Sequence, residues 1–208
     1  VIGDGEDVIK EIIEESRRQK TEGRSKKQLL NDLAGLDGVY VPSIHDASKQ
    51  KIRRRIVDDL DKAPFPDAPL LPYTSIVHDR VAIEISRGCT KGCRFCQAGM
   101  IYRPLRERSL ETVLSIAQKS ILNTGYEEVS FTSLSTGDYS SLLPLIRGFN
   151  RLCSGSHTSV SLPSLRVGAV SSDVLKEIKS VRKTGFTIAP EAGTKRLRDV
   201  INKDFTDE

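Results

Sequence analysis

From residue 81 onward, short apolar runs alternate with longer segments in which apolar residues recur every three or four positions. The short runs predict strands at 81–85, 129–134, 159–162 and 186–189. The longer segments predict helices at 109–123, 140–152, 171–181 and 195–201. Gly125 and Gly185 are expected to close two of these helices. This alternation predicts an α/β fold with a parallel sheet and right-handed crossovers, either a barrel or an open sheet.

The beginning of the chain carries a separate pattern. A helix is predicted at 6–20 because four apolar side chains fall on one of its faces: Val8, Ile9, Ile12 and Ile13. Ser25 is expected to cap a second, shorter helix that ends at two glycines. Strands are predicted on either side of these helices, at 1–2 and 39–41.

Prolines dominate the segment that joins the two patterned parts. Four of them, Pro64, Pro66, Pro69 and Pro72, fix extended backbone and exclude a helix or a central strand. We therefore expect three regions: a first domain at 1–43, a linker with a proline-rich arm at 44–75, and a second domain at 76–208.

Composition narrows the class of protein. The 208 residues are 38% hydrophobic and 29% charged, as expected for a globular chain, and no apolar run reaches the roughly 18 to 20 residues that span a bilayer. We expect no membrane partner. The chain begins without Met or a secretory leader, so we interpret it as an internal fragment of a longer protein. Its four cysteines are too few for a disulfide scaffold, which indicates a reducing, cytoplasmic setting.

The formal net charge of +4 has its main source in one basic run at 49–55, which is followed at once by Asp58, Asp59 and Asp61. A short basic run with its own counter-charges is typical of a solvated face. Binding of RNA or DNA is the alternative interpretation of the same residues.

Three cysteines, Cys89, Cys93 and Cys96, come directly after the strand predicted at 81–85. Active-site groups of α/β folds gather at the carboxyl ends of parallel strands. Three thiolates can hold three irons of a cubane cluster and leave the fourth iron open to a ligand. Nearby basic residues, Arg87, Lys91 and Arg94, favour the thiolate forms.

A structural zinc site is the alternative for these cysteines, with Cys153 as the fourth ligand. Zinc sites normally consist of two pairs of ligands, whereas Cys153 stands alone at the end of a predicted helix. The simpler interpretation of Cys153 is a small buried residue.

The cysteine spacing, with an aromatic residue before the last cysteine, resembles the signature of the radical S-adenosylmethionine (SAM) superfamily. Other strings resemble the branch of this superfamily that carries an N-terminal cobalamin-binding-like domain: 3–6, 84–89, 96–99, 103–104, 133–135, 189–193, 196–198 and 201–203. The resemblance implies a partial (β/α)6 TIM-like barrel with about four units present, preceded by the tail of a Rossmann-like cobalamin-binding-type domain. The ligand motif Asp-x-His-x-x-Gly is absent, so cobalamin is unsupported by this chain and is expected, if at all, only in the full-length protein.

The same resemblance implies an activity. A 4Fe-4S cluster on the three cysteines would reductively cleave SAM to a 5'-deoxyadenosyl radical, which acts on an unknown substrate. An electron donor such as flavodoxin or ferredoxin is then an expected partner, while RNA as a substrate rests only on the basic run. The alternative function is a zinc-stabilised nucleic-acid-binding module.

The resemblance also implies which residues contact SAM. Phe95 would lie near the adenine, and Thr136, Gly137 and Asp138 would hold the amino group. Ser161 and Glu191 are the candidates for the ribose, and Arg166 is the candidate for the carboxylate. Two alternatives stay open: Glu191 as a cap of the last predicted helix, and Arg196 or Arg198 in place of Arg166.

Overall fold

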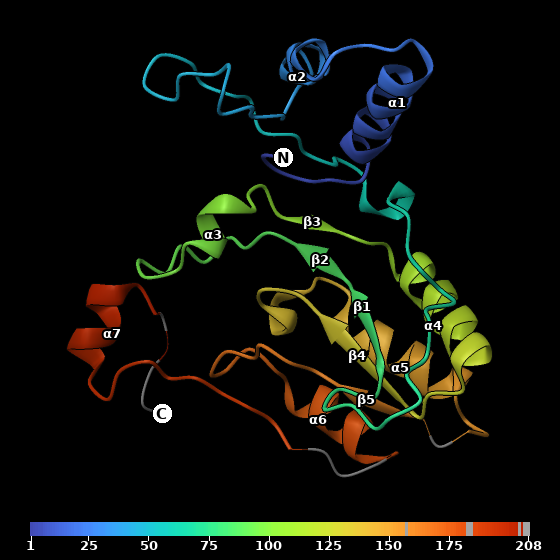
Figure 1. Cartoon of the computed structure of the whole chain (residues 1–208). Helices are drawn as coiled ribbons and strands as arrows, with labels where there is room; N and C mark the ends of the chain where they lie inside the picture. The colour runs from blue at the N-terminus through green and yellow to red at the C-terminus, as the bar shows by residue number, and fades with distance from the viewer. Residues whose placement is uncertain (157, 182–184, 204, 206–208) are drawn as a thin grey trace. The chain divides into compact units, whose positions relative to one another are not determined.

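The computed structural model describes residues 1–156, 158–181, 185–203 and 205 (Figure 1). The chain divides into two compact units, Val1–Pro64 and Phe65–Glu208. This division falls inside the segment 44–75 that the prolines predicted as a linker. Residues 64–80 contain neither helix nor strand, as expected for a proline-rich arm.

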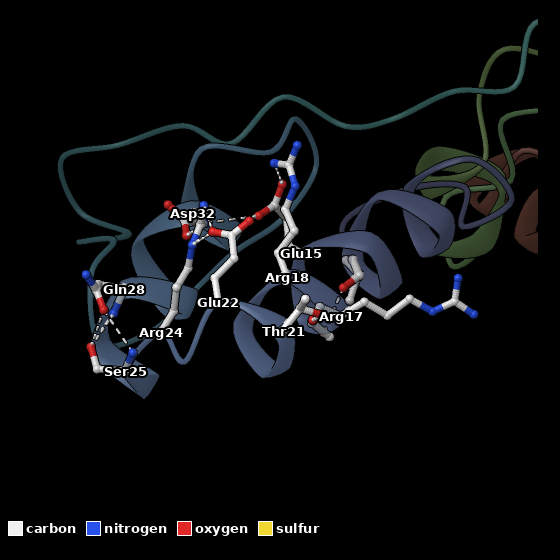
Figure 2. Close-up of polar contacts among 11 residues, drawn as sticks. Glu15, Arg17, Arg18, Thr21, Glu22, Arg24, Ser25, Gln28 and Asp32 are labelled. Atoms are coloured by element: carbon white, nitrogen blue, oxygen red, sulfur yellow. Dashed lines mark hydrogen bonds and ion pairs between the residues drawn. The ribbon is translucent and has the colours of Figure 1, made fainter.

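Two helices form the first unit, α1 (Val8–Thr21) and α2 (Lys26–Ala34), followed by a single 3-10 turn, η1 (Leu60–Lys62). Ser25 caps α2 as predicted. Its hydroxyl accepts from the backbone N–H of Gln28 at 3.3 Å, and the Gln28 side chain accepts from the Ser25 N–H at 2.8 Å (Figure 2). This reciprocal pair satisfies two N–H groups that the start of a helix leaves without partners.

The strands predicted at 1–2 and 39–41 do not form. The N–H of Ile2 donates to the carbonyl of Gly38 at 2.7 Å, and Gly3 makes a single isolated bridge to Arg55. Val39 and Val41 are buried in a small core with Val8 of α1. Burial of two alternating valines against a helix therefore produced the pattern, without a neighbouring strand to complete a ladder.

Part of the basic run at 49–55 is neutralised by carboxylates of the same unit. Arg55 pairs with Glu11 of α1 at 2.5 Å, and Lys49 pairs with Asp46 at 3.1 Å. Among the aspartates after the run, Asp59 pairs with Lys62. These contacts agree with a solvated face that carries its own counter-charges.

A three-stranded parallel sheet forms the centre of the second unit. Its order is β1 (Val81–Glu84), β4 (Glu128–Thr132) and β5 (Ser159–Ser161), with Val81 paired to Val129 and Val129 to Val160. The crossover helices α4 (Leu110–Thr124), α5 (Leu142–Leu152) and α6 (Ser172–Lys179) pack side by side. The predicted α/β class and parallel sheet are confirmed.

Buried side chains of the sheet and its helices make one apolar core. Ile83 of β1, Phe131 of β4 and Leu145, Ile146 and Phe149 of α5 are fully buried. The rings of Phe131 and Phe149 meet edge to face, with centroids 5.5 Å apart. The core thus fixes β1 and β4, the strands whose carboxyl ends carry the candidate chemistry.

The last predicted units differ from expectation. The strand predicted at 186–189 is reduced to one isolated bridge between Ile188 and Leu165. The helix α6 ends at Lys179 with Ser180 as its C-cap, so Gly185 does not close it. Gly125 does close α4, in the left-handed conformation. The final helix, α7 (Lys195–Ile201), has the predicted bounds.

A small antiparallel ribbon was not predicted. It pairs β2 (Ser86–Arg87) with β3 (Arg106–Glu107) and closes a long loop, which contains the short helix α3 (Ala98–Ile101). None of the helices among residues 1–156, 158–181 and 185–203 is long and apolar enough to cross a membrane.

Candidate functional site

We call residues 88–105, which the β2–β3 ribbon encloses, the cysteine loop because they contain Cys89, Cys93 and Cys96. The loop starts at Gly88, whose φ is +92°. A Cβ atom there would lie 2.5 Å from the carbonyl oxygen of Pro104 and 2.6 Å from that of Tyr102. Glycine is therefore required for the two ends of the loop to approach each other.

Two arginines stabilise the second half of the cysteine loop through its backbone carbonyls. The buried Arg106 donates to Pro104 at 3.1 Å and to Tyr102 at 3.2 Å, and Arg103 donates to Gly99 at 3.0 Å. Carbonyl groups in an irregular loop lack strand partners, so the guanidinium groups supply the missing donors.

The three cysteines carry free thiols and are half-buried. The Cys89 sulfur accepts from the N–H of Lys91 at 3.5 Å, and the Cys96 sulfur accepts from the N–H of Gly99 at 3.3 Å. Within the part of the chain that the structure describes, no group of three or more His, Cys, Asp or Glu side chains has the arrangement of a metal site. The thiols are thus present on one accessible loop, but they do not converge on a common point.

The donor set nevertheless has the chemistry of an iron–sulfur site. Cysteine thiolates are the usual ligands of 4Fe-4S clusters, and hydrogen bonds to their sulfurs help to set the cluster potential. Three thiols on a single loop, with backbone N–H groups already directed at Cys89 and Cys96, fit such a group.

The basic residues expected to favour the thiolates have other partners. Arg87 pairs with Glu84 at 2.8 Å, and Lys91 pairs with Asp138 at 2.9 Å. The guanidinium of Arg94 donates to the carbonyl of Val200 in α7. The contacts of Lys91 and Arg94 therefore hold the cysteine loop to the segment after β4 and to α7.

Asp138, which the resemblance assigns to the amino group of SAM, lies beside the cysteine loop. It ends a 3-10 turn, η2 (Thr136–Asp138), that follows β4. One carboxylate oxygen faces the Lys91 ammonium at 2.9 Å, and the other accepts from the hydroxyl of Ser135 at 2.5 Å. A small pocket joins these segments, with the lining Ser86, Gly88, Cys89, Thr90, Leu105, Glu107, Ser135 and Asp138.

The other two residues of the predicted amino-group motif support the turn. Thr136 is fully buried, and its hydroxyl lies 3.3 Å from that of Ser133. A Cβ atom on Gly137 would lie 2.6 Å from the Cβ of Ala169, so the segment after β5 packs directly on this glycine.

Phe95 and Glu191 are connected through Lys203, a residue of the string 201–203 that was assigned no role from the sequence. The Lys203 ammonium lies 3.3 Å from a Glu191 carboxylate oxygen and 5.8 Å from the centre of the Phe95 ring. The side chain of Lys203 is only 8% exposed, whereas Phe95 is 54% exposed. No pattern in the sequence marks Lys203, because its burial and its contacts with Glu191 and Phe95 are seen only in the structure.

Glu191 does not cap α7. The hydroxyl of Thr194 accepts from the N–H of Leu197 at 3.4 Å and takes that place. The buried Arg198, an alternative candidate for the SAM carboxylate, donates to the carbonyls of Ala192 and Gly193.

Ser161 and Arg166 lie at the carboxyl end of β5. Ser161 is the last residue of the strand and pairs with Ser130 of β4, and Arg166 follows in the half-buried segment that leads to α6. Both candidates are therefore at the same edge of the sheet as Asp138.

Cys153 stands apart from the cysteine loop. It is the C-cap residue of α5, it belongs to the apolar core, and it is 6% exposed. Burial raises the pKa of its thiol, against the opposing effect of hydrogen bonds with Ser156 and Thr158. Its interpretation as a small buried residue is confirmed.

The second unit is a parallel α/β fold in which a loop with three free cysteines follows the first strand. This combination is typical of proteins that bind a metal cluster through thiolates. Comparison with known proteins makes the assignment specific. The profile of the Radical SAM superfamily matches residues 83–208, and that of radical SAM proteins, N-terminal, matches residues 1–42. The chain belongs to the radical SAM superfamily, whose members are generally enzymes that use an iron–sulfur cluster and SAM.

The chain is also similar to an archaeal protein, the uncharacterized protein MJ0966 of Methanocaldococcus jannaschii. The two are 32% identical over 178 residues, which is 86% of this chain and 38% of that relative. The chain thus spans well under half the length of the curated relative that it matches. The profile that matches residues 1–42 represents an N-terminal region of radical SAM proteins and does not mention cobalamin. The cobalamin-binding-type origin of this segment therefore stays a prediction.

Proposed function

We propose that this chain is the core of a radical SAM enzyme in which Cys89, Cys93 and Cys96 hold a 4Fe-4S cluster. When bound, the cluster supplies the electron that cleaves SAM to methionine and a 5'-deoxyadenosyl radical, and this radical acts on a substrate that is not identified. The observation that carries the proposal is the meeting of the cysteine loop with Asp138 at the carboxyl end of the parallel sheet.

Asp138 is the proposed acceptor for the ammonium group of SAM. Its carboxylate already accepts an ammonium, that of Lys91, and Ser135 orients its second oxygen. Charge-assisted hydrogen bonds of this kind are stronger than neutral ones. Thr136 is fully buried in the same turn, and Gly137 allows the segment after β5 to pack against it.

The remaining proposed contacts with SAM involve its adenine, ribose and carboxylate groups. Phe95 is proposed to lie against the adenine, since its ring is 54% exposed and an aromatic ring can stack on a planar base. Ser161 and Glu191 are proposed for the ribose hydroxyls, and Arg166 for the methionine carboxylate.

A partial TIM-like barrel is the proposed architecture, with the three-stranded sheet as its first part and the segments around Leu165 and Ile188 as the start of a fourth strand. We further propose a cytoplasmic protein that receives its electron from a flavodoxin or a ferredoxin. Cobalamin would belong to a part of the full-length protein outside this chain.

Equilibrium binding of SAM to the anaerobically reconstituted protein tests the site. Asp138→Asn should weaken binding by about tenfold or more, because loss of a charge-assisted hydrogen bond costs roughly 1.5 to 3 kcal/mol. Asp173→Asn is a matched control, because Asp173 pairs with the exposed Lys176 on the surface of α6. Equal binding by the two variants would remove Asp138 from the site.

A further inference from the structure

The end of α7 contacts the cysteine loop across more than a hundred residues of sequence. The side-chain amide nitrogen of Asn202 donates to the carbonyl of Lys91 at 3.0 Å and to that of Gly92 at 2.9 Å. In Figure 1, α7 lies next to the loop that leads into α3. These two carbonyls belong to the turn between Cys89 and Cys93, so one side chain holds the backbone that separates two of the thiols.

The geometry of Asn202 suits this contact. Asn202 is the C-cap of α7 in the left-handed conformation, with φ of 57° and ψ of 45°. Asparagine tolerates this conformation better than most residues that carry a Cβ. Its amide group has two hydrogens, so both carbonyls can accept at the same time.

A second residue of the loop secures the contact from the opposite direction. The backbone N–H of Arg94 donates to the carbonyl of Ile201 at 2.9 Å, and the guanidinium of Arg94 donates to the carbonyl of Val200. The last carbonyls of a helix have no partner within the helix. The turn of the cysteine loop and the end of α7 therefore satisfy each other's unpaired backbone groups.

We propose that Asn202 is the positioning residue of the cysteine loop: its amide fixes the turn at 90–93 and thereby sets how the Cys89 and Cys93 thiols are presented. The contact of Asn202 with the loop is independent of any cluster, whereas its function in positioning cluster ligands rests on the proposed function. The neighbouring Lys203 extends the same contact, because it pairs with Glu191 and lies over Phe95. The α7 end thus connects the cysteine loop to the proposed nucleoside contacts.

Hydrogen exchange of the metal-free protein tests the contact independently of any cluster. Asn202→Asp keeps the shape of the side chain but replaces the two donors with acceptors that face two carbonyls. We expect the amides of residues 90–96, including that of Arg94, to exchange about tenfold faster, because the loss of hydrogen bonds of ordinary strength lowers the free energy of local opening. Asn202→Gly, which keeps the left-handed backbone and only removes the amide, should give a smaller increase of the same sign.

A change on the exposed face of the same helix provides the control. Lys195→Ala removes the exposed pair of Lys195 with Asp199 and should leave exchange in the cysteine loop unchanged. Amides of the sheet should exchange as in the wild type in all three variants. Unchanged exchange in both Asn202 variants, or equal acceleration in Lys195→Ala, would overturn the proposed role.

The reconstituted protein shows whether positioning matters for the metal site. Asn202→Asp should release iron several-fold faster to a chelator than Lys195→Ala and should alter the electron paramagnetic resonance spectrum of the reduced cluster. If the wild type takes up no iron, the proposed function fails while the exchange result still decides the contact. If Asn202→Asp loosens the loop but retains iron and spectrum, Asn202 holds the loop without positioning the cluster ligands, and the inference is wrong.

Discussion

The ammonium nitrogen of Lys91 lies 2.9 Å from a carboxylate oxygen of Asp138. A residue of the cysteine loop is thus paired with the carboxylate that is proposed to bind the ammonium of SAM. Both side chains are about one-third exposed, and an ion pair of this kind contributes roughly 0 to 1 kcal/mol. We therefore expect Lys91→Met to leave stability almost unchanged. The ammonium of SAM should bind more tightly to this variant, by up to about fivefold, because it no longer competes with Lys91.

Titration of SAM into the reconstituted wild type, Lys91→Met and Lys91→Arg measures this effect. Arginine keeps the positive charge and should restore affinity close to that of the wild type. Weaker binding by Lys91→Met would show that Lys91 itself contacts the ligand and would contradict a competing role.

Gly88→Ala should disrupt the cysteine loop. The new methyl group would press on the carbonyls of Pro104 and Tyr102, at a φ that is strained for alanine. We expect a loss of about 2 to 4 kcal/mol in the free energy of unfolding, measured by urea denaturation, together with reduced iron uptake. Gly155→Ala is the control, since a Cβ there meets no atom within 4 Å. A loss of similar size in both variants would contradict the steric argument.

The buried thiol of Cys153 predicts a pH dependence of stability. Burial raises its pKa, so the folded protein keeps Cys153 neutral to higher pH than the unfolded chain does. The stabilisation from burying it should be complete below the ordinary thiol pKa of about 8.5 and should decline as pH rises through the raised pKa.

Urea denaturation of the wild type and of Cys153→Ala at about pH 7 and about pH 10 checks this sign. The advantage of the wild type should be larger at the lower pH. An advantage that grows toward high pH would mean that Cys153 is a thiolate in the folded protein, which would reopen its role as a metal ligand.

Local patterns predicted most of the second unit. The helices α4, α5 and α7 and the strands β1, β4 and β5 formed close to their expected bounds because apolar periodicity acts over a few positions. In the structure, Ser109 and Thr194 cap α4 and α7. The position of the cysteines after a strand likewise followed from the order of elements. The resemblance to the radical SAM superfamily was confirmed by the matched profile.

Features that depend on distant partners could not be predicted in the same way. The β2–β3 ribbon has only two residues on each side, too few to show an alternating pattern. The contacts of Asn202 with the cysteine loop, and of Lys203 with Glu191, arise only when α7 folds back on the loop. Val39 and Val41 alternate with other residues, and this pattern predicted a strand. Both valines are buried near Val8 of α1, and the sequence alone does not show whether such residues pack on a sheet or on a helix.

Anaerobic reconstitution with iron, sulfide and SAM tests the central claim most directly. The wild type should become brown, bind about four irons per chain and, with dithionite, form 5'-deoxyadenosine and methionine in equal amounts. Alanine at Cys89, Cys93 or Cys96 should abolish both, while Cys153→Ala should retain both. A colourless protein that holds stoichiometric zinc, and loses it in Cys153→Ala, would contradict the account.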